Sequence, residues 1–133
     1  MNNHNMAPFA AAVYSADTAD RNALSKFVEK QKASRTRVGG LLQEALFDDQ
    51  GATIGLNAVD VARNLRIRIT RSVEKNDGCA FDASALAQTA AVIDNAIDDR
   101  LDLVVVEKFG ELEQNGQGLI DEILRTIAAD IPC

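Results

Sequence analysis

The sequence predicts an α/β fold, namely a three-layer sandwich on a mostly parallel sheet with one small β hairpin added. Three observations carry this prediction. Near the start, a strand, a helix and a second strand follow one another within about 35 residues, which is typical of a parallel βαβ unit. Further on, Leu101–Val106 is a short apolar run of the kind buried on both faces of a parallel sheet. Amphipathic helices precede and follow that run, as a layered α/β domain requires.

The first unit begins after a polar segment, residues 1–8, that we expect to be a flexible tail. Phe9–Tyr14 is a compact apolar run and predicts the first buried strand. A helix begins after Asp20 or Thr18, either of which can cap it, and continues to about Ser34. Its apolar face repeats at helical spacing, at Leu24, Phe27, Val28 and Gln31.

The second strand is predicted over Val38–Leu42, directly after a basic turn. It contains the pair Gly39-Gly40, and glycine weakens a strand unless the position needs it. Paired glycines in a strand indicate a bulge or the close approach of another backbone.

A β hairpin is predicted next. Leu65, Ile67 and Ile69 alternate with polar residues, which is typical of a strand with one solvated face. Residues 62–64 then form the turn to a preceding strand over Ile54–Val61. A helix over Asn57–Leu65 is the competing interpretation.

The second half of the chain reads as loop, helix, strand and helix. Ser72–Ala80 is a polar loop, and Asp82 caps a helix that ends near Asp99 with an apolar stripe at Leu86, Ala90, Ile93 and Ile97. A last helix covers residues 119–127. The chain then stops where a further strand is expected. We therefore predict one domain over residues 9–133 that lacks a C-terminal strand, and a sheet edge open to a second copy of the chain.

The net charge of the chain excludes some classes of binding partner. The net charge is −6 and the pI is about 4.7, so the chain is not expected to bind nucleic acid or an anionic membrane surface. Basic side chains do gather in one stretch. They either lie on the solvated sides of one strand or turn or form a patch that faces an anion, with Arg66 and Arg68 as the candidates for an oxyanion such as phosphate or molybdate; they are Arg63, Arg66, Arg68 and Arg71.

Cysteine and histidine usage excludes several kinds of site. Cys79 and Cys133 are far apart, so they form neither a disulfide framework nor a zinc knuckle. The one histidine, His4, lies in the polar tail, which excludes histidine-based triads built by this chain alone. Cys79 either is a small buried residue or is a thiol activated by the start of a helix. The leader lacks the features of a signal peptide, and we expect a cytoplasmic protein.

Carboxylates follow the apolar strand at close spacing, as Glu107, Glu111 and Glu113. The carboxyl ends of strands are where open α/β sheets place their ligand crevice. These residues either form a general-base or Mg²⁺-water site or belong to a solvated acidic loop. Lys108 either contacts an anion or forms a surface ion pair of less than about 1 kcal/mol.

The stretch VVVEKFGELEQ resembles the strand-and-loop signature DEIGKME of the THEP-type nucleoside-triphosphatases, which are small P-loop proteins. Glu107, Gly110 and Glu113 match its acids and its glycine, and RVGGLLQEAL is similar to that family's second strand. The chain is most similar to a bacterial branch of unknown function that is often encoded near molybdate-transport genes. That branch typically shows a basic residue followed by F-G-x-L-E, as at Lys108–Glu113 here, and a Cys followed by a Leu or Phe and an Asp before a helix, as at Cys79–Asp82.

The resemblance implies a P-loop-NTPase-like fold with a nucleotide or small anion as ligand, and Mg²⁺ if a nucleotide binds. It implies catalytic roles for Glu107 and Glu113, with Glu107 also as a metal ligand. It places ligand-binding groups at Asp17, Thr18, Lys108, Gly110 and Glu111.

The connector after the first predicted strand departs from the active family. A P-loop requires GxxxxGK[ST] there, so that backbone N–H groups and a lysine hold the phosphates. Ser15–Asn22 contains no glycine and no Gly-Lys-Ser/Thr, and it adds two carboxylates. Since phosphoryl transfer depends on positioning and charge stabilisation, this loss argues against ordinary NTP hydrolysis.

The sequence therefore predicts a degenerate P-loop-NTPase-like domain. We expect it to act as a ligand-binding or regulatory module in molybdenum-related physiology. The alternative is a metal-dependent nucleoside-triphosphatase or phosphohydrolase that uses the loop Glu107–Glu113. Whether the chain is an enzyme stays open at this point.

Overall fold

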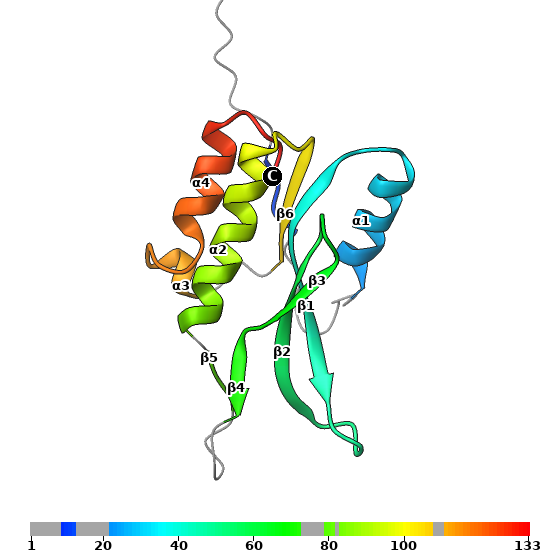
Figure 1. The fold of residues 1–133 in the computed structure, drawn as a ribbon, viewed down its shortest axis with the longest axis vertical. Helices are drawn as coiled ribbons and strands as arrows, with labels where there is room; N and C mark the ends of the chain where they lie inside the picture. Colours follow the sequence, from blue (N-terminus) through cyan, green and yellow to red (C-terminus); the bar gives the residue numbers. More distant parts are fainter. Residues whose placement is uncertain (1–8, 13–21, 73–78, 82, 108–110) are drawn as a thin grey trace, which may run out of the picture.

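The computed structural model describes residues 9–12, 22–72, 79–81, 83–107 and 111–133. Figure 1 shows a sheet with helices on both sides and a β hairpin that extends beyond them. The α/β class is therefore confirmed. In chain order the elements are α1 (Ala23–Ala33), β1 (Val38–Phe47), β2 (Thr53–Asp60), β3 (Leu65–Arg68), β4 (Thr70–Ser72), β5 (Cys79–Phe81), α2 (Ala83–Asp98), β6 (Leu103–Val106), α3 (Glu111–Gln114) and α4 (Ile120–Ala128).

The main sheet has four strands in the order β3-β2-β1-β6. β2 pairs antiparallel with both β1 and β3, whereas β1 and β6 are parallel. The prediction of a mostly parallel sheet is therefore wrong for the described strands. The reason lies in β1, which continues to Phe47 instead of ending at Leu42. It then turns directly back into β2, and a tight turn of this kind can only join antiparallel strands.

The turn between β1 and β2 is held by one carboxylate. Asp48 Oδ1 accepts hydrogen bonds from the backbone N–H groups of Gln50 and Ala52, both at 2.9 Å. Gly51 closes the turn at a φ of 82°, in the left-handed region that favours glycine. Aspartate and glycine in these places are ordinary turn signals. They are visible in the sequence, but they do not reveal how long the strands before and after them are.

The predicted hairpin of β2 and β3 is confirmed, and the competing helix over residues 57–65 is wrong. The strands pair from Asn57 opposite Arg68 to Asp60 opposite Leu65. In the turn, Asp60 Oδ1 accepts from the backbone N–H groups of Ala62 and Arg63. A side chain thus satisfies two N–H groups of the turn. A backbone bond, from Asn64 N to the Asp60 carbonyl at 2.7 Å, closes it before the chain enters β3.

A second, small sheet follows β3. β4 pairs antiparallel with β5, from Thr70 opposite Phe81 to Ser72 opposite Cys79. The predicted loop over residues 72–80 thus ends in a strand that the sequence did not indicate. A strand of three residues is too short for its periodicity to be recognised.

The close pairing of β1 with β6 explains the second glycine of the pair, Gly40. The two strands are in register from Val38 opposite Leu103 to Leu41 opposite Val106. Gly40 has a φ of 108°, and a Cβ atom there would lie 2.8 Å from Val105 N and still nearer to Val105 O. The expectation of a close backbone approach is confirmed for Gly40, whereas a Cβ at Gly39 would meet the side chains of Leu101 and Ala96.

Both ends of the described chain lie near the outer edge of β6. Val104 N donates to the Pro132 carbonyl at 2.9 Å, and Ala10 N donates to the Cys133 carbonyl at 3.1 Å. Residues 9–12 are exposed and form no strand, so the prediction of a buried first strand is wrong for this part of Phe9–Tyr14. Its remaining two residues lie outside the described ranges, as does the predicted tail.

The long helices agree with the sequence to within a few residues. α1 begins after Asn22, whereas the predicted caps Thr18 and Asp20 lie outside the described residues. In α2 the predicted stripe is buried or half-buried from Ala90 onward, but Leu86 at its start is exposed. The one helix that the sequence missed is α3, a single turn inside the acidic loop.

Helices cover both faces of the sheet (Figure 1). On one face, Ile93 of α2 is wholly buried and packs with Leu41 and Ala58. On the other face, Val28 of α1 packs with Val38, Val61 and Val105, and Lys32 Nζ of α1 donates a hydrogen bond to the Val61 carbonyl. β1 is therefore the strand on which both helix layers converge.

Candidate functional site

Glu107 stands directly past the end of β6, as the sequence predicts, but its carboxylate is already engaged. Its backbone N–H donates to the Leu41 carbonyl at 2.9 Å. Its Oε2 atom accepts a hydrogen bond from the backbone N–H of Gln43, also at 2.9 Å. Both partners belong to β1. A carboxylate that accepts from a backbone amide forms a charge-assisted bond, stronger than one between neutral groups.

Only some of the other predicted site residues belong to the part of the chain that the structure describes. Glu113 lies in α3 and is half-buried, and Glu111 opens the same helix, although its side chain is outside the description. Asp17, Thr18, Lys108 and Gly110 lie outside the described residues. Their roles in binding or catalysis stay predictions. Within the described part, no three carboxylate, cysteine or histidine side chains are grouped to hold a metal ion.

The basic stretch forms part of an exposed charged face on β3. Arg66 Nε lies 3.0 and 3.1 Å from the two carboxylate oxygens of Glu44, which reaches across from β1. Arg68 Nε donates to the Thr70 carbonyl at 2.8 Å, and its guanidinium lies against Gly55. Both side chains are exposed, as the solvated-face interpretation requires. Sequence reasoning missed Glu44, because a partner two strands away leaves no local pattern.

We expect the Arg66–Glu44 pair to contribute only about 0.2–1 kcal/mol to stability, because both side chains are exposed and water screens their charges. A double-mutant cycle with Arg66→Gln and Glu44→Gln, followed by urea denaturation, measures this coupling. The coupling should decrease further in 1 M salt. A coupling above 2 kcal/mol that salt does not change would contradict this expectation.

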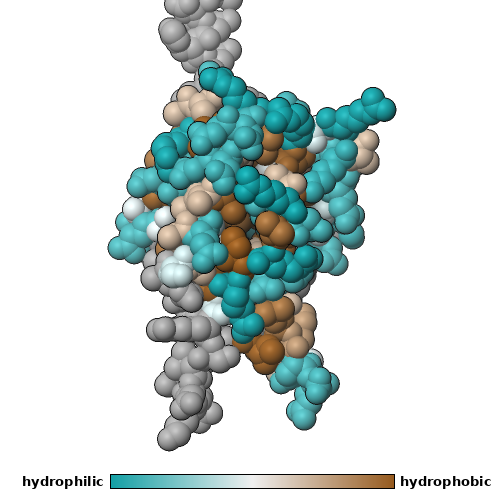
Figure 2. All heavy atoms as spheres, in the orientation of Figure 1, coloured by the Kyte–Doolittle hydropathy of each residue, from teal (hydrophilic) through white to brown (hydrophobic). Residues whose placement is uncertain are grey.

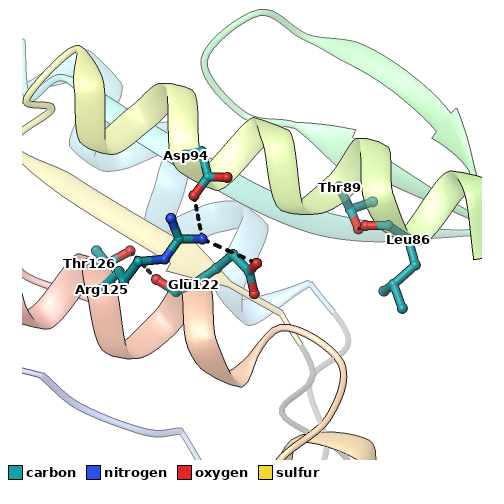
Figure 3. A network of polar contacts seen from close by, with 6 residues as sticks. All are labelled: Leu86, Thr89, Asp94, Glu122, Arg125 and Thr126. Atoms are coloured by element: carbon teal, nitrogen blue, oxygen red, sulfur yellow. Dashed lines mark hydrogen bonds and ion pairs between the residues drawn. The ribbon is translucent and has the colours of Figure 1, made fainter.

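A second polar network joins α2 to α4 (Figure 3). Arg125 Nη2 lies 2.7 Å from Asp94 Oδ1 and 3.3 Å from Glu122 Oε1. Thr126 Oγ1, wholly buried, donates to the Glu122 carbonyl at 2.8 Å. An open hollow of about 530 Å³ beside these residues is lined by Asp121, Glu122, Leu124, Arg125 and Ala128. Its one arginine is already paired with carboxylates, so the hollow has no free positive charge to attract an anion.

Apolar side chains are exposed on the β1–β2 hairpin. Phe47 is 56% exposed and Ile54 is 43% exposed. Figure 2 shows apolar surface just above the hydrophilic tip of this hairpin. This exposed apolar surface was not expected from the sequence, because the β1–β2 hairpin itself was not predicted.

The thiol of Cys133 is half-buried beside Val104 and Ile131. Burial raises the pKa of this thiol, because the thiolate is poorly solvated there. A raised pKa makes the group a weaker nucleophile at neutral pH. The side chain of Cys79, the other thiol considered above, lies outside the description.

None of the described helices is long and apolar enough to cross a membrane.

Comparison with known proteins places this chain in a family. The model of "Protein of unknown function (DUF2478)" matches residues 9–133. The chain is also 32% identical, over 124 residues, to the molybdenum import ATP-binding protein ModC 2 of Bradyrhizobium diazoefficiens. That match covers 92% of this chain but 14% of the relative's length. No solved structure matches significantly. The chain thus belongs to the DUF2478 family of proteins of unknown function.

Proposed function

We propose that this chain is a P-loop-NTPase-like domain that has lost its phosphate-binding loop and serves molybdenum physiology as a ligand-binding or regulatory module. The observation that carries the proposal is the similarity to ModC 2. The relative is named for binding ATP in molybdenum import, and a segment of 14% of its length resembles nearly all of this chain.

The sequence of this chain suggests an accessory role. This chain has no GxxxxGK[ST] motif, which an ATP-binding protein of the P-loop class needs to hold phosphates. A segment without that motif is therefore better suited to sensing or regulation than to ATP hydrolysis. The position of Glu107 is consistent with this, because an acid bonded to Gln43 N is less available to orient a water molecule.

We propose an oxyanion such as molybdate as the ligand, held near the carboxyl end of β6 by Lys108 and Gly110. Asp17, Thr18 and Glu111 are the other residues for which the family resemblance predicts ligand binding. Arg68 on β3 marks the competing location, because Arg66 beside it is already paired with Glu44.

Isothermal titration of the intact chain with molybdate, tungstate, sulfate, Mg-ATP and Mg-GTP tests the proposal. We expect saturable binding of molybdate and no release of phosphate from either nucleotide. Lys108→Gln should weaken molybdate binding about tenfold, the effect of losing one charge-assisted hydrogen bond. Arg68→Gln is the matched control on the other basic surface and should bind as the unmodified chain does.

Three results would change this conclusion. If Arg68→Gln weakens molybdate binding and Lys108→Gln does not, the binding site lies on β3. Micromolar nucleotide binding with turnover contradicts the loss of NTPase function. Phosphate release that requires Mg²⁺ or Mn²⁺ and disappears in Glu107→Gln supports the hydrolase alternative instead.

A further inference from the structure

We infer that Glu107 is a positioning residue, whose side chain extends the β1–β6 ladder by one hydrogen bond and holds β1 where the hairpin leaves the domain. The inference goes beyond the proposed function and does not depend on it. It rests on the contacts of Glu107 with two residues of β1, Leu41 and Gln43.

The register shows which group Glu107 replaces. In a parallel ladder, every second residue of one strand accepts from the residue after its partner and donates to the residue before it, and Leu41 and Gln43 are two such residues of β1. Leu41 is opposite Val106, so its carbonyl accepts from Glu107 N, as observed at 2.9 Å. Two residues on, the N–H of Gln43 would then donate to the main-chain carbonyl of Glu107. It donates instead to Oε2 of the Glu107 side chain, at 2.9 Å.

The bond between Glu107 and Gln43 lies where β1 loses its pairing with β6. β6 ends at Val106, whereas β1 continues six residues past Leu41 to Phe47. Beyond Gln43, β1 is paired in the main sheet with β2 alone. We call residues 43–57 the hairpin arm. This arm includes the exposed Phe47 and Ile54, and Glu107 binds it at its root.

The contact requires an oxygen acceptor at this position but no negative charge. Glutamine offers an amide oxygen of the same reach, so Glu107→Gln can keep the bond to Gln43 N, whereas Glu107→Ala cannot. A general base or a metal ligand behaves differently, because glutamine removes both functions. The two substitutions therefore separate a positioning role from a catalytic one.

Hydrogen exchange of the Gln43 amide, followed by NMR, tests the inference. We expect Glu107→Ala to accelerate exchange at Gln43 about tenfold or more relative to Ile93, which is wholly buried in α2 and reports global opening. Glu107→Gln should restore protection to within a few-fold. Asp49→Asn removes a charge from the exposed hairpin turn and should leave both amides unchanged.

Two outcomes would overturn the inference. One is unchanged Gln43 exchange in Glu107→Ala, which shows that the side chain does not protect this amide. The other is equal acceleration at Gln43 and Ile93, which indicates a loss of global stability without a local role at the root of the arm. Neither result affects the titration with molybdate, so the two proposals fail separately.

Discussion

We expect Gly40→Ala to lower the free energy of unfolding by about 4 kcal/mol, the largest effect of any substitution considered. Two costs add at this position. The backbone has a φ of 108°, which an L-residue adopts only with strain of about 1–3 kcal/mol. A Cβ atom would also meet Val105 N at 2.8 Å and the Val105 carbonyl at a shorter distance, and such overpacking costs about 1–3 kcal/mol. The backbone of β6 cannot move aside without breaking its pairing with β1.

Gly51→Ala is the matched control for Gly40. Its φ of 82° imposes similar backbone strain, but a Cβ there meets no atom within 4 Å. We expect it to cost about 1–2 kcal/mol, from strain alone. Urea denaturation of the two variants measures the difference. Equal losses of stability in both would show that the contact between the two strands contributes nothing.

We expect Ile93→Ala to lower the free energy of unfolding by about 3–4 kcal/mol. Ile93 is 0% exposed and lies in the core between α2 and the sheet, beside Leu41, Ala58 and Ile69. Replacing it removes buried methylene groups and leaves a cavity, a change that typically costs about 2–5 kcal/mol. The middle of that range applies, because the facing strands β1 and β2 are paired with each other and cannot collapse fully into the space.

Leu124→Ala is the matched control on α4, because Leu124 is 56% exposed. We expect a change within about 0.5 kcal/mol, as is usual for surface substitutions. Thermal and urea unfolding of the two variants give the comparison. A loss above 2 kcal/mol for Leu124→Ala would show that its side chain is covered in solution by something that the described residues do not include.

The helices could be predicted because their signal is local. α1, α2 and α4 each show apolar residues at three- and four-residue spacing within one stretch of sequence. α3 and β5 could not be found in this way, since four and three residues do not show a period. The same reasoning missed the exposed start of the α2 stripe at Leu86, because periodicity does not show where a covering layer ends.

The sheet was predicted less well, because strand pairing depends on contacts far apart in the sequence. The glycine pair indicated that another backbone comes close, which is right for Gly40, but not that this backbone is β6, more than sixty residues away. The turn at Asp48–Gly51 was visible in the sequence, yet its effect was not. This turn joins β1 and β2 in one long hairpin, and the pairing within that hairpin makes the sheet mostly antiparallel.

The sequence by itself determined the α/β class, the three long helices and the place of an acidic residue at the carboxyl end of a buried strand. These follow from composition and periodicity, which are local. Only the tertiary structure decided what Glu107 contacts, because its partner, Gln43 N, lies 64 residues earlier in the chain. A carboxylate in a sequence is equally suited to hold a metal, activate a water molecule or accept from a backbone amide. Which of these it does depends on the donors that folding brings within about 3 Å of its oxygens.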